Sequence, residues 1–480
     1  MTSYLERSSL KDSAGAAPGS RVPPAQIPGR LVMLLLGLWL AFSCSRSFGF
    51  PKLEGFPDVT FERLSFLLLI LVAGTAMAHQ KGSIGPVRWP EWGLWMTAGL
   101  AAVSGVAYGG FASGYPGAEI TILLNLLLLP AIAYSVVLRT RWSPRDLDVL
   151  FGILGGFGVY LGLTAILESS GVHSLVFPAT IVDPQIAQHW GRARGPFLQA
   201  EFNGVVMVQL VPVALHLATL RRGWYRALGI VAGGLLCLGA YLTETRAVLL
   251  SLLVVLVIGV GHRGPQRRVY AMFLALALLA VSGKQLLGPP AIPRLDEIGP
   301  IQDRLKLTSV TLNMIRGHPL TGIGFGNFDL RQEGFFDPSA RMVAQLTEGT
   351  FWSGGTHNTL LTPFAELGIV VGGLFLLLVL RILWLGLARS RQARLTAAHG
   401  GAPPLLCCTL VCIAFVVNTL FVELRYTLTP NALFWVCAGL IETYRGSLWN
   451  PAVAQAPPVV RQGDTSAGAA DSRSADAARP

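Results

Sequence analysis

Residues 356–387 read THNTLLTPFAELGIVVGGLFLLLVLRILWLGL, and this stretch decides the fold class. Between Glu366 and Arg381 it contains no charged residue. A helix needs about 20 consecutive, mainly apolar residues to cross the hydrocarbon core of a bilayer. The stretch therefore predicts a transmembrane helix.

The composition of the whole chain extends this prediction. Of the 480 residues, 52% are hydrophobic and only 13% are charged, whereas a soluble domain is usually about 25% charged. The net charge of +11 could indicate a nucleic-acid partner. However, the basic residues stand in short clusters between apolar runs, which is typical of cytoplasmic loops in membrane proteins. We therefore expect a membrane protein and no nucleic-acid partner.

Apolar segments of spanning length recur along the chain and predict an all-α, polytopic membrane protein with about 12 transmembrane helices. A window of about 19 residues places them at 31–48, 64–79, 91–111, 118–138, 147–167, 200–220, 227–242, 247–261, 270–283, 359–387, 405–421 and 429–444. This divides the chain into a disordered cytoplasmic head (1–30), helices one to nine (31–283), a long periplasmic loop (284–358), helices ten to twelve (359–446) and a disordered cytoplasmic tail (447–480).

Basic residues fix the predicted orientation. They fall in every second connection, and short basic loops stay in the cytoplasm. The residues are Lys81 and Arg88; Arg139, Arg141 and Arg145; Arg221, Arg222 and Arg226; Arg263, Arg267 and Arg268; and Arg389, Arg391 and Arg394. Both termini are therefore expected in the cytoplasm. In a bacterium, the connections 168–199, 243–246 and 284–358 would then face the periplasm.

His357 stands just before the tenth predicted helix, where Thr356 or Asn358 would be a suitable N-cap. The positive end of the helix dipole disfavours imidazolium, so this histidine would be neutral and able to accept a proton. Free N–H groups at the same helix end would suit a phosphate. The alternative is a histidine that merely lies at the membrane interface.

Arg246 closes the short turn Thr243-Glu244-Thr245-Arg246 on the same predicted face. An arginine so close to hydrocarbon needs an anionic partner or an aqueous cavity. Its guanidinium could hold a phosphate through two parallel hydrogen bonds, or it could pair with Glu244.

Arg192 and Arg194 precede the sixth predicted helix, again on the outer face, and form a second candidate anion site. Lipid headgroups also attract arginines there, so the pair alone is a weak signal. The predicted gathering of Arg192, Arg194, Arg246 and His357 on one face carries more weight than any one of them.

Three other features were weighed. GIGFG at 322–326 resembles a nucleotide-binding loop, but no strand–helix unit surrounds it, so we expect an outer-face turn. Glu366 is an ionisable residue within a predicted span and so a functional candidate; its spacing from His357 puts the two on opposite helix faces. The six cysteines lie in or beside apolar segments and predict neither disulfides nor a metal site.

Four motifs together resemble the O-antigen ligase and polymerase superfamily. The block HNTLLTPFAELG at 357–368 is similar to the superfamily's signature, and GHPLTGIGFGNF at 317–328 to the loop motif before it. Thr245-Arg246 stands where members carry Ser-Arg, and residues 192–197 resemble an arginine-rich motif. Two departures are Thr245 for Ser and a three-residue gap between Gly368 and Gly372, where the ligase pattern has two.

The resemblance implies a glycosyltransferase of the bacterial inner membrane that uses no nucleotide sugar, cofactor or metal. It would move a glycan from undecaprenyl pyrophosphate to an acceptor hydroxyl at the periplasmic face, in O-antigen, exopolysaccharide or capsule synthesis. It implies that Arg246, with Arg192 or Arg194, holds the pyrophosphate. It also implies that His357 is the general base on the hydroxyl of the glycan or lipid acceptor, or orients that hydroxyl, with Asn358 beside it in the binding site.

A polysaccharide transporter or flippase is the main alternative. Transporters place ionisable groups near the bilayer midplane, often in matched halves. Glu366 favours this alternative, whereas the lack of an internal repeat disfavours it. A scaffold for an export complex would leave the gathered arginines unexplained.

Overall fold

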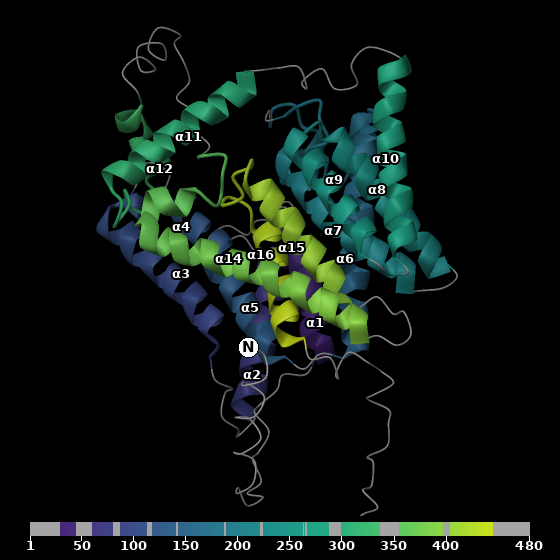
Figure 1. Ribbon diagram of the computed structural model, residues 1–480, viewed down its shortest axis with the longest axis horizontal. Coiled ribbons are helices and arrows are strands. Elements are labelled where there is room, and N and C mark those ends of the chain that lie inside the picture. The colour runs from purple at the N-terminus through teal and green to yellow at the C-terminus, as the bar shows by residue number, and fades with distance from the viewer. Residues whose placement is uncertain are drawn as a thin grey trace, which may run out of the picture. The chain divides into compact units, whose positions relative to one another are not determined.

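Helices form nearly all of the regular structure in the computed structural model (Figure 1). The structure describes residues 29–44, 60–79, 87–112, 118–140, 143–186, 189–220, 224–262, 264, 266–287, 299–336, 355–396 and 404–444. These residues contain no β-strand, and the unit that ends at Tyr444 contains all of them. The predicted tail and residues 1–28 of the predicted head lie outside them, whereas Gly29 and Arg30, assigned to the disordered head, belong to α1.

The helices follow the apolar segments of the sequence. The first half contains α1 (Gly29–Phe42), α2 (Phe61–His79), α3 (Trp89–Ala107), η1 (Gly110–Ala112), α4 (Ala118–Leu123), η2 (Leu124–Leu128), α5 (Leu129–Arg139), α6 (Pro144–Ser169), η3 (His173–Leu175), η4 (Ala179–Val182) and η5 (Gly195–Phe197). The second half contains α7 (Ala200–Leu220), α8 (Trp224–Leu242), α9 (Arg246–Gly261), α10 (Arg267–Leu287), α11 (Gly299–Gly317), α12 (Phe328–Arg331), η7 (Gln332–Phe335), α14 (Thr362–Thr396), α15 (Pro404–Thr419) and α16 (Leu428–Thr443).

Four of the described helical stretches are long and apolar enough to cross a bilayer. They are Glu119–Arg139, Arg145–Ser169, Ala200–Thr219 and Thr362–Ala393. Shorter apolar helices lie at Gly29–Phe42, Gly229–Leu242, Arg246–Gly261 and Pro404–Thr419. The described residues are therefore all-helical, as predicted, and are consistent with a membrane protein, whereas the number twelve and the placement of the loops stay predictions.

The core is built around α7, which packs against α6, α8 and α15. Of the most apolar stretch of α7, 89% is buried, whereas the corresponding share for α14 is 39%. Helix α7 is therefore central and α14 is peripheral. Two buried amides on α7 donate inside the bundle: Asn203 to the carbonyl of Ala193 (3.1 Å) and Gln209 to that of Pro430 (3.2 Å). These bonds reduce the cost of burying the amide nitrogens, whereas the amide oxygens of both side chains have no hydrogen-bond partner among the described residues.

The segment predicted as the fourth span is interrupted by one π-helical turn, η2. Pro130 follows it and has no N–H to donate to the preceding turn. Such π turns often occur at functional sites. Here the turn carries Asn125, whose side-chain amide donates to the carbonyl of Tyr426 (3.0 Å) in the loop between α15 and α16.

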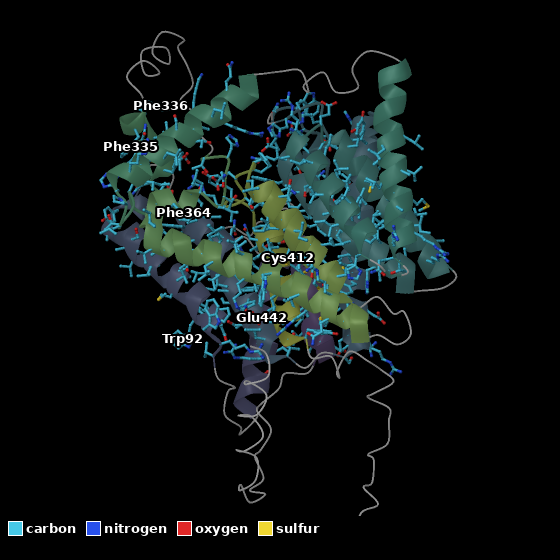
Figure 2. The ribbon with its side chains drawn as sticks, in the orientation of Figure 1. Trp92, Phe335, Phe336, Phe364, Cys412 and Glu442 are labelled. Atoms are coloured by element: carbon cyan, nitrogen blue, oxygen red, sulfur yellow. The ribbon has the colours of Figure 1, made fainter. Side chains whose placement is uncertain are left out.

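The connection 284–358 contains helices of its own. α11 and α12 lie beside the start of α14 (Figure 1). Their buried cluster consists of Val310, Met314, Ile323, Phe328 and Ala365, with Ile315, Phe335 and Phe336 packed on it (Figure 2, where Phe335 and Phe336 are labelled). Ala365 belongs to α14, so this part of the connection is packed against the helix that follows it.

Candidate active site

The two longest motifs of the sequence meet through backbone hydrogen bonds. The N–H groups of Ile323 and Gly324 donate to the carbonyls of Ala365 (2.9 Å) and Glu366 (3.0 Å), and the N–H of Ile369 donates to the carbonyl of Pro319 (2.8 Å). GIGFG is thus a turn against α14, as predicted. These two N–H groups bind protein, so they are not available to cradle a phosphate.

Gly368 makes this junction possible. Its φ of 81° and ψ of 174° break α14 after its first turns, and only glycine readily adopts this conformation. A Cβ atom there would lie 2.2 Å from the carbonyl oxygen of Leu320. The predicted helix 359–387 is therefore a short helical piece, a break and a longer helix.

His357 lies in the turn that precedes α14. The helix begins at Thr362, later than predicted, but Asn358 caps the turn before it: its Oδ1 accepts the N–H groups of Leu360 (3.1 Å) and Leu361 (3.0 Å). The predicted cap is therefore correct in kind. His357 has a φ of 53°, which is strained for a residue with a Cβ and is found mostly where function requires it.

The imidazole of His357 is half-buried, and its Nδ1 atom is enclosed without a hydrogen-bond partner among the described residues. In neutral histidine one ring nitrogen is a donor and the other an acceptor. Proton acceptance by Nε2 would require the proton to reside on Nδ1, and this is the atom that the turn encloses.

Glu423, from the loop between α15 and α16, holds this turn in place. Its Oε2 accepts the N–H of Thr356 (3.2 Å), the hydroxyl of Thr356 (2.9 Å) and the hydroxyl of Thr362 (2.9 Å). One carboxylate oxygen thus joins the residue before His357 to the first residue of α14.

Arg425 lies beside Glu423 and is almost completely buried, with 1% of its surface exposed. Its NH1 donates to Glu366 (2.8 Å), its NH2 donates to Asp329 (3.3 Å) and to the Tyr426 hydroxyl (2.7 Å), and its Nε is 3.9 Å from Glu423. Burial opposes the charge, but the acidic groups around it raise the pKa of Arg425 well above its ordinary value. The guanidinium is therefore a permanent cation at the centre of three carboxylates.

No role in the site was predicted from the sequence for Arg425, Glu423 or Asp329. A signal existed, because Arg425 stands between two strongly apolar segments in the same way as Arg246, and such an arginine needs a partner. Glu366 was considered as a functional group in its own right, whereas the structure pairs it with Arg425. No bond between Glu366 and His357 occurs among the described residues, in agreement with their predicted separation.

Arg192 is joined to the turn that carries Arg246. Its Nε donates to the carbonyl of Thr243 (2.8 Å) and its NH2 to the hydroxyl of Thr245 (2.6 Å). The N–H of Ala193 also donates to the carbonyl of Leu242 (3.2 Å). Two predicted site segments that are distant in sequence are thus joined by hydrogen bonds.

Helix contacts place the joined Arg192 and Arg246 segments at the same end of the bundle as the His357 turn. Ser251, a little over one turn after Arg246, donates to the carbonyl of Ala414 (3.1 Å), a little over one turn before the end of α15. The last residue of α15, Thr419, accepts the N–H of Thr359 (2.9 Å). At a rise of about 1.5 Å per residue, the starts of α9 and α14 and the end of α15 lie in one region.

Arg194 has a different environment from Arg192. It is fully buried and donates to the carbonyls of Ile181 (2.9 Å), Asp183 (2.6 Å) and Ile186. It also lies 3.6 Å from Glu168 and 4.8 Å from the centre of the Trp190 ring. The guanidinium therefore holds the segment 181–186, in the connection between α6 and α7, through its main-chain carbonyls.

Comparison with known families agrees with the motif order. Residues 231–378 match the family model described as O-antigen ligase. The match places this segment in the O-antigen ligase superfamily. The O-antigen ligase segment contains Arg246 and His357, whereas Arg192 and Arg425 lie outside it. No curated protein matches the chain. The superfamily predicted from the motifs is therefore confirmed for this segment, and the match supports an O-antigen ligase-type function in general.

Proposed function

We propose that the protein transfers a glycan from a polyprenyl pyrophosphate, such as undecaprenyl pyrophosphate, to an acceptor hydroxyl at the periplasmic face of the bacterial inner membrane. The proposal rests on two turns that lie at the same end of the bundle. One carries Arg246 and is joined to Arg192; the other carries His357. Two arginines at the same end of the bundle as a strained, half-buried imidazole suit a reaction in which an anion leaves as a proton is removed.

In the proposed step, the acceptor hydroxyl attacks the anomeric carbon of the glycan. The bond from that carbon to the pyrophosphate oxygen breaks, and the leaving pyrophosphate takes the electron pair. Nε2 of His357 takes the hydroxyl proton. Arg246 and Arg192 stabilise the charge on the leaving group, which is usually the largest contribution of such a site.

We assign the phosphate contacts to Arg246 and Arg192 rather than to Arg194. Arg192 donates to the carbonyl of Thr243 and to the hydroxyl of Thr245, which places its guanidinium against the turn that carries Arg246. Arg194 instead donates to three carbonyls and lies beside Glu168. Asn358 shapes the turn through its side chain, so we place it in the support of the acceptor site.

Glu366 was the main argument for a transporter. Its carboxylate binds Arg425 and the N–H of Phe328 (3.2 Å), which gives the buried charge a structural reason. The transferase therefore accounts for more of the site than a flippase does.

Purified protein, supplied with an undecaprenyl-pyrophosphate-linked glycan and candidate acceptors, would test the proposal. General base catalysis typically contributes about 10²–10⁴-fold, so His357→Ala should lower the transfer rate by about that factor, and Arg246→Ala should also raise KM for the lipid donor. His173→Ala and Arg316→Ala are matched controls, because both residues are exposed and lie outside the proposed site. Wild-type rates in both site variants would contradict the proposal, and so would glycan movement across vesicles without transfer.

A further inference from the structure

The environment of Arg425 suggests a role that goes beyond stability. Its four partners come from three separate parts of the chain: Asp329 on α12, Glu366 on α14, and Glu423 with Tyr426 in the loop between α15 and α16. Removing one partner from a buried ion pair is strongly destabilising, because the remaining charge is left uncompensated. This arrangement therefore holds the three segments in one relative position.

Each of these segments touches the turn that carries His357. Oδ1 of Asp329 accepts the N–H of Gly355 (2.9 Å), and Glu423 accepts both donors of Thr356. Both residues that precede His357 are thus held by carboxylates that lie against Arg425. The hydroxyl of Tyr426 adds a bond to Oδ2 of Asp329 (2.9 Å), which orients that carboxylate.

The space between Gly355 and the guanidinium is too small for a side chain. A Cβ atom at Gly355 would lie 3.0 Å from NH2 of Arg425 and 2.9 Å from Glu423. The backbone of the turn therefore packs closely against the ion network.

We propose that Arg425 is a positioning residue: through Asp329 and Glu423, its guanidinium sets the backbone of residues 355–356 and thereby the direction of the His357 imidazole. The inference rests on the proposed role of His357 as the base. Arg425 itself touches no substrate in this scheme. Lysine would keep the charge, but it lacks the planar fork that reaches several acceptors in fixed directions.

Arg425→Lys is the central variant, assayed for glycan transfer together with wild type and His357→Ala. A displaced base should lower kcat by about tenfold or more, since a shift of about 1 Å can cost about 100-fold, while KM for the lipid donor changes by less than about threefold. Arg139→Lys is the matched control, because Arg139 is paired with Glu91 on α3, outside the proposed site. It reports the general cost of replacing a paired arginine in this protein.

A double-mutant cycle separates positioning from a merely structural role, because residues that act through one another have non-additive effects. If Arg425 acts through His357, Arg425→Lys should cause little further loss of kcat in the His357→Ala background. An equal loss in both backgrounds, or wild-type kcat in Arg425→Lys, would overturn the inference. If Arg425→Lys is not recovered folded, Glu423→Gln keeps the arginine and carries the same cycle.

The two proposals fail in different ways. An inactive His357→Ala beside a fully active Arg425→Lys removes only the positioning role. A fully active His357→Ala removes the base, and the positioning role falls with it.

Discussion

At the scale of the residue, Thr245 shows how a departure from the expected motif is accommodated. The superfamily pattern has serine at this position, and the hydroxyl of Thr245 accepts a hydrogen bond from NH2 of Arg192. Serine and threonine offer the same acceptor. The substitution therefore leaves the link between Arg192 and the Arg246 turn intact.

Replacement of Thr245 tests this link. Thr245→Ser should stay within about twofold of wild-type transfer, because the acceptor remains. Thr245→Val removes the acceptor, and a hydrogen bond to a charged group contributes about 1.5–3 kcal/mol. We therefore expect KM for the lipid donor to rise about tenfold or more in Thr245→Val. Donor titrations of the purified variants measure it, and equal KM values for both variants would show that the link does not support donor binding.

Gly355 offers a second test at this scale. Its φ is 76°, and left-handed backbone costs a residue with a Cβ about 1–2 kcal/mol. Gly355→Ala should therefore lower the melting temperature and reduce transfer by about tenfold or more, because the Cβ would also press on Glu423. Gly373→Ala is the control, since a Cβ there meets no atom within 4 Å. Wild-type transfer in Gly355→Ala would contradict the described geometry of the turn.

At the scale of the element, most helices follow from the sequence because long apolar segments can satisfy their backbone in a bilayer only as helices. The predicted segments 64–79, 200–220 and 247–261 correspond to α2, α7 and α9, to within a few residues. The π turn η2 and the break at Gly368 could not be predicted from the sequence, because each depends on residues that are distant in sequence. The amphipathic α11 was also missed, since a search for bilayer spans ignores helices with charged faces.

The break in α14 gives a prediction of its own. Gly368→Ala would place a Cβ 2.2 Å from the Leu320 carbonyl, so the junction between residues 319–324 and α14 must open. We expect amide hydrogen exchange to accelerate at Ile323, Gly324 and Ile369, whose N–H groups form that junction. Exchange in α7, at the centre of the bundle, should not change. Unaltered exchange at all three amides would contradict the role given to Gly368.

At the scale of the whole molecule, the sequence predicted which segments meet better than how they meet. The gathering of Arg192 and Arg246 was expected from charge and loop position, and hydrogen bonds join Arg192 to the turn that carries Arg246. The grouping of carboxylates around Arg425 was not expected, because Asp329, Glu366 and Glu423 show no common spacing in the sequence. Only the packing of α12, α14 and the α15–α16 loop brings them together.

The predicted orientation of the molecule in the membrane can be measured directly. Ser309→Cys on α11 and Arg391→Cys on α14 introduce thiols at exposed positions. If α11 faces the periplasm, a maleimide that cannot cross membranes should label Ser309→Cys in intact spheroplasts, and Arg391→Cys only after permeabilisation. The cysteines of the wild-type chain, five of them buried, give the background. The reverse pattern would invert the proposed topology.

The junction between residues 319–324 and α14 has a consequence for how such proteins diversify. Its three hydrogen bonds join main-chain atoms, so they survive most changes of side chain. Leu320, within the junction, leaves 72% of its surface exposed. Exposed side chains beside the junction can therefore change while the main-chain frame that joins this loop to α14 keeps its shape.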